Sequence, residues 1–130
     1  MENLREYFER TEGVGVLATA DFGGKVDAAL YERPNFIDNE TLAFVMTDHL
    51  SHQDLGSNPH AAYLFMESGG HGQGTRLYLT KIKEEQDDAA IDRLLEQKQY
   101  EVPDTEEKPL FLVYFHIDRI RRLVEDGEQP

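Results

Sequence analysis

The side chains best suited to chemistry stand in one short segment, TDHLSHQDL at residues 47–55. An apolar, strand-like run ends there and a short helix is expected to begin. Backbone N–H groups at a helix start, together with the helix dipole, favour an anion such as a phosphate. Thr47 and Ser51 add hydroxyl donors and His52 adds a ring nitrogen, so the segment is predicted to bind an anion. In the alternative interpretation Ser51 only caps the helix, with Asp54 at capping-box spacing, and the histidines are solvated.

A second candidate is the glycine-rich loop GGHGQG at residues 69–74, which is followed by Thr75 and Arg76. Four glycines in six residues would let the backbone approach a flat ligand closely, or would simply let the loop move. The loop does not match the phosphate-loop pattern, because no Gly-Lys-Ser/Thr follows it. A ligand contact and a mobile hairpin connection both stay open at this point.

Metal binding and covalent catalysis find little support in the residue types. His49 and His52 have an H-x-x-H spacing, but His49 is expected to precede the helix, which breaks the one-face geometry. Zinc usually needs three or four protein ligands, so we expect no metal site. The chain has no cysteine and no G-x-S-x-G pattern, which excludes disulfides, thiolate chemistry and a nucleophile elbow. No catalytic residue is assigned from the sequence.

The charge balance limits the partners of the chain. Its 130 residues include 26 Asp and Glu against 13 Lys and Arg, a formal net charge of −13. This balance argues against nucleic acid and against an anionic membrane surface, because both are bound largely through Lys and Arg. A small anionic ligand would need a local exception to it.

Length and hydropathy predict a single cytoplasmic domain over residues 1–130. The first residues, MENLREYFER, lack the apolar core of a signal peptide. The longest uncharged apolar runs, such as LFLVYF at 110–115, have the length of a strand and are too short to cross a bilayer.

The elements that must position the candidate residues are mostly strands. Apolar runs separated by turns that contain glycine, asparagine or proline indicate strands at 13–20, 25–31, 41–47, 61–67, 75–85 and 110–117. Helices are expected at 2–11, 51–57 and 87–98. Six short strands with few helices indicate a closed antiparallel sheet, so the fold class is mainly β and the sheet a barrel. One small barrel cannot cover apolar residues such as Tyr31, Phe36, Phe65 and Tyr78 on both faces, which favours a dimer.

The order of these pieces resembles the pyridoxamine 5′-phosphate oxidase-like flavin-binding split barrels, over roughly residues 2–120. GVGVLATAD with its glycine turn resembles the family's first hairpin. TLAFVMTDHLSHQDLGSNPHAAYLF resembles its strand, phosphate-binding turn, short helix and next strand, and GQGTRLYLTKIKEEQD resembles its long strand before the late helix. The resemblance implies a six-stranded antiparallel split β-barrel of Greek-key type. It also implies a homodimer with two flavin mononucleotide (FMN) sites at the subunit interface.

The same resemblance implies which residues would hold the FMN. The isoalloxazine ring would lie on the second and third strands, at Tyr31, Glu32, Arg33, Val45, Met46 and Thr47. The phosphate would meet the turn at Thr47, Ser51, His52 and Gln53. Gln73 and Thr75, from the glycine-rich loop and the next strand, would contact the flavin from either subunit.

Two departures from the family pattern shape the functional expectation. Members that hold the phosphate firmly place Arg and Lys after the serine, where this chain has His52 and Gln53. A charge-assisted hydrogen bond is roughly twice as strong as a neutral one, so phosphate binding should be weakened unless Arg33 or Arg76 compensates. The chain also ends without the Arg-bearing C-terminal segment through which true pyridoxamine phosphate oxidases hold their substrate, so that activity is not expected.

The leading hypothesis is therefore an FMN-binding redox protein or oxidoreductase of unknown substrate, in which the cofactor carries the chemistry. The alternative is a flavin-free split barrel that serves as a binding or regulatory module. A third possibility is the same barrel with a deazaflavin or haem, for which Arg33, Arg76 or the group Arg119, Arg121 and Arg122 would have to gather at the cleft.

Overall fold

The computed structural model describes residues 3–86, 88–97 and 110–124. Its elements, in chain order, are α1 (Leu4–Arg10), β1 (Gly13–Ala20), β2 (Val26–Tyr31), β3 (Asn35–Phe36), β4 (Thr41–Thr47), α2 (Leu50–Ser57), β5 (His60–Glu67), β6 (Gly74–Glu85), α3 (Asp88–Gln97) and β7 (Leu110–Arg122). The prediction of a mainly β fold with a few short helices is confirmed.

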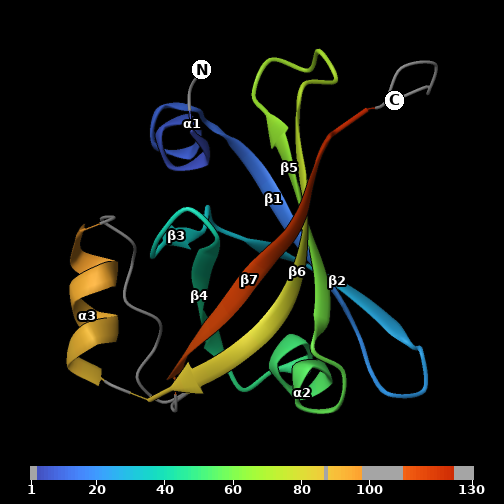
Figure 1. Cartoon of the computed structure of the whole chain (residues 1–130), viewed down its shortest axis with the longest axis vertical. Helices are drawn as coiled ribbons and strands as arrows, with labels where there is room; N and C mark the ends of the chain where they lie inside the picture. Colours follow the sequence, from blue (N-terminus) through green and yellow to red (C-terminus); the bar gives the residue numbers. More distant parts are fainter. Residues whose placement is uncertain (1–2, 87, 98–109, 125–130) are drawn as a thin grey trace.

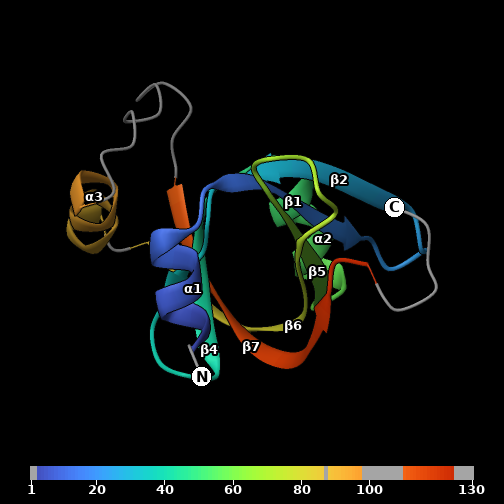
Figure 2. The same cartoon turned by 90° about the horizontal axis from the view of Figure 1, so that it is seen from above.

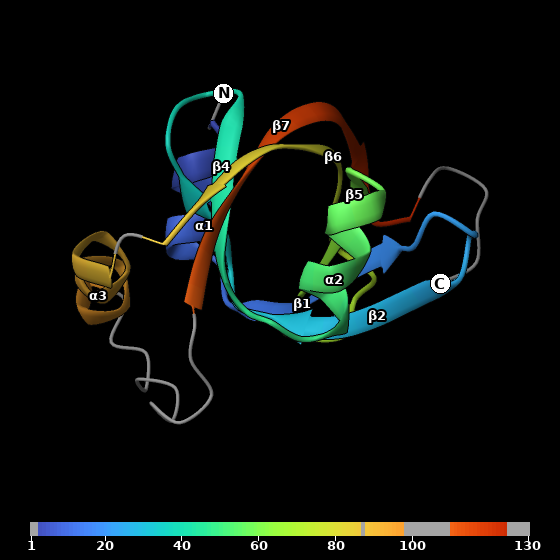
Figure 3. The same cartoon turned by 90° about the horizontal axis from the view of Figure 1, so that it is seen from below.

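The described strands form one antiparallel sheet in the order β2-β1-β5-β6-β7-β4-β3. Views along the barrel show this sheet curling into an incomplete ring, a half-barrel, with α1 and α2 packed on it and α3 outside it (Figures 2 and 3). In the face-on view the long strands β6 and β7 cross the whole molecule beside each other (Figure 1). Along the described part of the chain, no helix has the length and apolar character needed to span a membrane.

The prediction of six strands is wrong, because the sheet has a seventh, β3. It is only two residues long, and Asn35 and Phe36 pair with Ala43 and Leu42 at the sheet edge. The side-chain amide of Asn35 also donates to the carbonyl of Ala43 over 3.2 Å. Two residues are too few to show an alternating pattern, and Pro34 before them cannot donate a hydrogen bond to a neighbouring strand. The sequence pattern therefore does not predict this strand.

The main core lies inside the curled sheet and is built by alternating residues of every long strand. Its fully buried members include Leu17, Leu42, Met46, Tyr63, Phe65, Leu77, Leu79, Val113 and Phe115. A second cluster on the opposite face of β4 and β7 joins Ala43, Leu110 and Leu112 to Ile91 of α3. Because residues 42–46 of β4 and 110–115 of β7 are covered on both faces, these stretches are continuously apolar rather than alternating.

The three predicted helices exist, but the start of α2 differs from the expectation. The helix begins at Leu50 with His49 as its N-cap, and no side chain makes a capping hydrogen bond there. The interpretation of Ser51 as the cap, paired with Asp54, is therefore wrong. The Asp54 carboxylate instead accepts a hydrogen bond from the Thr19 hydroxyl of β1, over 2.9 Å. The expected helix positions 2, 87 and 98, the loop at 102–109 and the tail from 125 lie outside the described residues.

Of the four apolar residues that the sequence suggested would stay exposed, Tyr78 is half-exposed on the outer side of β6, and the other three are not on an outer face. Phe65 is fully buried, and Tyr31 and Phe36 pack against the core. Strand pairing instead places a different set on one outer face of β2, β1 and β5, where directly opposed residues share a face. We call this the outer apolar face, and its most exposed members are Val14, Val26, Leu30, Leu64 and Met66.

Candidate functional site

The amino end of α2 has the backbone geometry of an anion site. His49 is extended, with φ −105° and ψ −169°, and its side chain leaves the first turn uncapped. The first N–H groups of a helix have no partner within the helix, so an uncapped start offers donors and the positive end of the helix dipole. The backbone of the predicted phosphate turn therefore suits a ligand oxygen.

The side chain of Ser51 is not available to such a ligand. Only 4% of the residue is exposed, and its hydroxyl donates to a carboxylate oxygen of Asp27 over 3.3 Å. The phenol of Tyr31 contacts the same hydroxyl. Burial raises the pKa of the Tyr31 phenol. Ser51 thus joins α2 to β2 inside the protein instead of facing solvent.

His52 is held between two carboxylates and an aromatic ring. Its Nδ1 lies 2.8 Å from Asp48 Oδ1 and its Nε2 lies 3.0 Å from Glu84 Oε2. Its ring stacks on Phe111, with 4.0 Å between the centroids and 16° between the planes. Lys81 also bonds Glu84. Because an ionised carboxylate only accepts hydrogen bonds, the ring of His52 meets an acceptor on each side.

The carboxyl of Glu84 is stabilised in its charged form. Burial disfavours that form, but hydrogen bonds from Lys81 and His52 outweigh the burial and hold the pKa of Glu84 below its usual range. Glu84 is thus an acceptor at neutral pH, placed beside the turn where the family resemblance puts a phosphate.

The other two predicted phosphate residues make weaker arrangements. The hydroxyl of Thr47 lies 3.1 Å from Nδ1 of His49. Gln53 is exposed, and its side-chain amide reaches the carbonyl of Asp48 only at 3.5 Å. The structure therefore places Thr47, Ser51, His52 and Gln53 at one turn, where Ser51 and His52 contact carboxylates and Thr47 and Gln53 do not.

The residues predicted to carry the isoalloxazine ring divide between buried and open positions. The side chain of Met46 is 1% exposed and lies in the core, so only its backbone could meet a ligand. Val45 belongs to the cluster under α3. Thr41 bonds the segment after β3 and Glu40 bonds β7, so by alternation the backbone groups of Val45 point away from β7, and no strand among the described residues pairs with β4 there.

Two neighbouring predicted residues act within the fold. Arg33 donates through Nη1 to the carbonyls of Phe8 and Thr11, over 3.0 and 2.9 Å, and so ties down the end of α1. The carbonyl of Glu32 accepts a hydrogen bond from the buried phenol of Tyr63 over 3.1 Å. The guanidinium of Arg33 therefore points to α1 rather than to the turn at α2.

Gln73 and Thr75 lie at the far end of the molecule from α2. Thr75 and Glu84 are nine positions apart on β6, which corresponds to about 30 Å along an extended strand. Glu84 contacts His52, whereas Gln73 and Thr75 line cavities between α1 and the β5–β6 loop. Within one chain the structure does not bring the two predicted groups together.

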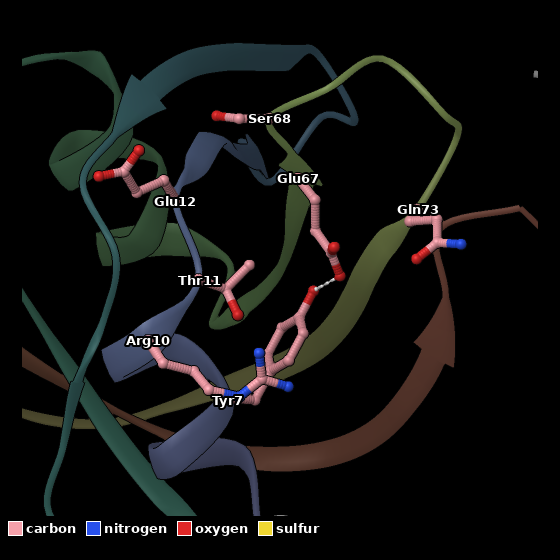
Figure 4. Close-up of a pocket in the computed structure, with 7 residues that line it drawn as sticks. All are labelled: Tyr7, Arg10, Thr11, Glu12, Glu67, Ser68 and Gln73. Atoms are coloured by element: carbon pink, nitrogen blue, oxygen red, sulfur yellow. Dashed lines mark hydrogen bonds between the residues drawn. The ribbon is translucent and has the colours of Figure 1, made fainter.

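The cavity at that far end contains a pair that the sequence did not reveal. It has a volume of about 610 Å³ and is lined by Tyr7, Arg10, Thr11, Glu12, Glu67, Ser68 and Gln73 (Figure 4). The phenol of Tyr7 donates to Glu67, and burial together with this bond raises the pKa of Tyr7 to about 12. The sequence pattern places Tyr7 on the apolar face of a helix and Glu67 at the end of a strand. No local pattern links these two positions, which are 60 residues apart.

Positive side chains gather at the outer surface of β6 and β7. Arg76 is paired with Arg121 and Tyr78 with Arg119, so the three arginines share one face. Arg76 also lies opposite Leu64, at the border of the outer apolar face. Among the described residues, three arginines therefore gather at this end of β6, whereas the α2 turn has Lys81 bound to Glu84, and Arg33 belongs to neither group. In the described ranges, no group of three His, Asp or Glu side chains is arranged to hold a metal ion.

Comparison with known proteins identifies the fold. No family model matches the sequence, and no curated protein matches it. Among solved structures, an FMN-binding protein from Syntrophomonas wolfei superposes with a TM-score of 0.74 at 14% identity, over 91% of this chain and 82% of the other. An F420 reductase gives a TM-score of 0.74 at 14% identity, over 93% and 98%. A protein from Listeria innocua, proposed to be a pyridoxamine 5′-phosphate oxidase, gives 0.63 at 20% identity, over 89% and 91%. The predicted split-barrel fold is confirmed.

Proposed function

We propose that this split barrel is a flavin-binding protein that works as a homodimer, with the isoalloxazine ring at the interface between two copies. The observation that carries the proposal is the fold likeness, over most of both chains, to a protein that binds FMN. When bound, a flavin supplies hydride or electron transfer, and the protein supplies binding, orientation and exclusion of water. We assign no catalytic acid or base.

The parts of the chain that would meet the ring system fit a flat, largely apolar ligand. The edge of β4 beyond β3 leaves the backbone N–H and C=O of Val45 open for hydrogen bonds to ring heteroatoms. The partly buried ring of Tyr31, which packs edge-on against Phe44 at 5.6 Å, adds an aromatic wall near α2. These features support a ring site near the junction of β2, β4 and α2.

Two features support a second copy of the chain as the other wall of the site. The outer apolar face leaves Val26 and Leu30 82% and 75% exposed, which is unusual for side chains of this kind on a strand. The predicted ligand residues also lie at opposite ends of β6, so one site can include both groups only if two copies contribute. A symmetric dimer would meet both requirements.

One observation favours a second candidate function. Two of the predicted phosphate ligands, Ser51 and His52, are engaged by Asp27, Asp48 and Glu84, and these carboxylates disfavour a phosphate dianion at the turn. This arrangement would equally suit a flavin-free split barrel that serves as a binding or regulatory module.

The visible absorption spectrum of the protein as isolated separates the two candidates. A flavin-binding protein should carry a flavin absorption band, or should show an increase in melting temperature when riboflavin or FMN is added. A protein without the band, whose melting temperature neither flavin changes, would be the flavin-free module, and the proposal would be wrong.

A further inference from the structure

We propose that the turn at the start of α2 makes this site select a flavin whose side chain ends in a hydroxyl, riboflavin, over the phosphorylated form, FMN. The inference rests on the proposed flavin binding and names the ligand of that same site. It follows from which groups of the turn are already paired and which remain to meet a ligand.

The strongest side-chain donors of the α2 turn are already paired with carboxylates. A phosphate needs hydrogen-bond donors, preferably charged ones. At this turn the Ser51 hydroxyl is buried against Asp27, and both ring nitrogens of His52 are taken by carboxylates. The hydroxyl of Thr47, which lies 3.1 Å from Nδ1 of His49, and the exposed amide of Gln53 remain at the turn, and both are uncharged donors.

The carboxylates of the α2 turn can still accept hydrogen bonds from a ligand. The Asp48 and Glu84 side chains are 52% and 30% exposed, so their carboxylates remain within reach of a ligand. Each carboxylate has acceptor sites beyond the one used by His52, and a hydroxyl group is a donor that suits them. The hydroxyls of a ribityl chain can donate here and can accept from the uncapped N–H groups of α2.

The side chains at the α2 turn carry a net negative charge. Asp27, Asp48 and Glu84 carry three negative charges at the turn, against one positive charge on Lys81 and at most one on His52, so these groups sum to 1 − 3 = −2 or 2 − 3 = −1 and are net negative in either case. A phosphate dianion placed against this cluster is repelled. Like charges about 4 Å apart near a protein surface repel strongly enough to weaken binding by about tenfold or more.

One other place in the fold could hold a phosphate. Arg76, Arg119 and Arg121 share a face at the opposite end of β6, and a second copy could bring them to the site. A phosphate site at these arginines would favour FMN. The relative affinity for riboflavin and FMN therefore shows at which end of β6 the end of the flavin side chain binds.

The test measures dissociation constants for riboflavin and for FMN by quenching of flavin fluorescence, with the unmodified full chain at low and at high salt. Riboflavin is expected to bind about tenfold more tightly than FMN at low salt. The ratio of the two dissociation constants should fall toward one at high salt, because screening weakens the repulsion of the phosphate.

A charge-removing variant assigns the effect to the turn. In Asp48→Asn/Glu84→Gln, FMN should gain about tenfold in affinity while riboflavin gains nothing. The control Glu9→Gln/Asp92→Asn removes the same charge from exposed positions on α1 and α3 and should leave the ratio of the two affinities unchanged. The salt series on the unmodified protein tests the inference even if the charge-removing variant does not fold.

The outcomes separate this inference from the proposed function. Tighter binding of FMN, or equal binding of both flavins, would overturn the inference and leave flavin binding intact. A preference for FMN that disappears in Arg76→Gln or Arg121→Gln would overturn it by placing the phosphate at the other end of β6. Binding of neither flavin would overturn the proposed function and this inference together.

Discussion

At the scale of single residues, the role of a side chain at the α2 turn depends on its neighbours more than on its type. Ser51 and His52 have the chemistry of phosphate ligands, yet Asp27 accepts from the serine and Asp48 and Glu84 contact the histidine. The same donors would serve an anion if those acceptors were absent. The residue types predicted a polar turn correctly, and the acidic partners decide what it can bind.

Glu84 should make the stability of the protein depend on pH in the acid range. Its folded pKa is lowered, so the stability that it contributes is complete above its unfolded pKa and is lost as the pH falls through the folded value. We expect Glu84→Gln to be less stable than the unmodified protein at pH ~7, with the difference shrinking toward pH ~4. Urea unfolding at a series of pH values measures this. Glu9→Gln serves as the control, and a difference for Glu84→Gln that stays constant over the range would contradict the argument.

Two glycines give opposite expectations for the same substitution. A Cβ at Gly15 would lie 1.9 Å from the Tyr63 hydroxyl and 2.8 Å from the Tyr31 carbonyl, whereas a Cβ at Gly56 meets nothing within 4 Å. Gly15→Ala should therefore destabilise the protein by about 1–3 kcal/mol, through overpacking. Gly56→Ala, inside α2, should stabilise it by about 0.5–1 kcal/mol. Denaturant unfolding compares the two, and similar changes in both variants would show that the close contact at Gly15 is not what matters.

At the scale of elements, the long strands follow from their sequences, whereas the attachment of the helices depends on distant contacts. The end of α1 is held by Arg33, which comes from the segment after β2 and donates to two carbonyls of that end. Phe8 of α1 is 3% exposed and packs against Phe36 and Phe65. The helix thus closes one end of the core through one buried ring and one guanidinium.

Removing the guanidinium should loosen α1. Arg33→Gln should lose about 1.5–3 kcal/mol of stability, since hydrogen bonds from a charged donor are lost and two carbonyls lose a partner. The same variant should speed amide hydrogen exchange in residues 4–10 more than in β5. The control is Arg93→Gln, which removes a charge from an exposed position of α3. Uniform acceleration across the whole chain would argue that Arg33 stabilises the fold in general and not α1.

At the scale of the whole molecule, an exposed apolar sheet face is the feature that a single barrel does not explain. β2, β1 and β5 carry the outer apolar face, and the arginines of β6 and β7 border it. A dimer through this face would remove Val14, Leu30 and Met66 from water.

Charge placed on this face should separate the two copies. If the proposed dimer forms through this face, the unmodified protein should sediment as a dimer at micromolar concentration and Leu30→Asp/Leu64→Asp as a monomer. The variant should still fold, because both side chains point away from the core. Ile37→Asp, at an exposed apolar position near β3, is the matched control and should remain dimeric. A monomeric unmodified protein would contradict the dimer and the interface site.

Much of the fold could be predicted because its signals are local. Apolar runs such as TLAFVMT, and the glycines that end the first strand, lie within a few residues of the structure they specify. β3 escaped prediction, since a two-residue strand exists only through its pairing with β4. The exposed apolar residues were misjudged for a similar reason: which side of a strand faces the core depends on the curl of the sheet.

By itself, the sequence determined the order of the long strands along the chain, the excess of acidic residues and the position of a polar turn before a short helix. Only the tertiary structure decided what that turn faces. Ser51 meets Asp27 across 24 positions of the chain, and His52 meets Glu84 across 32. Folding brings such partners together over distances along the chain that no local pattern spans. Those carboxylates, and not the residue types of the turn, set the charge that a ligand would meet there.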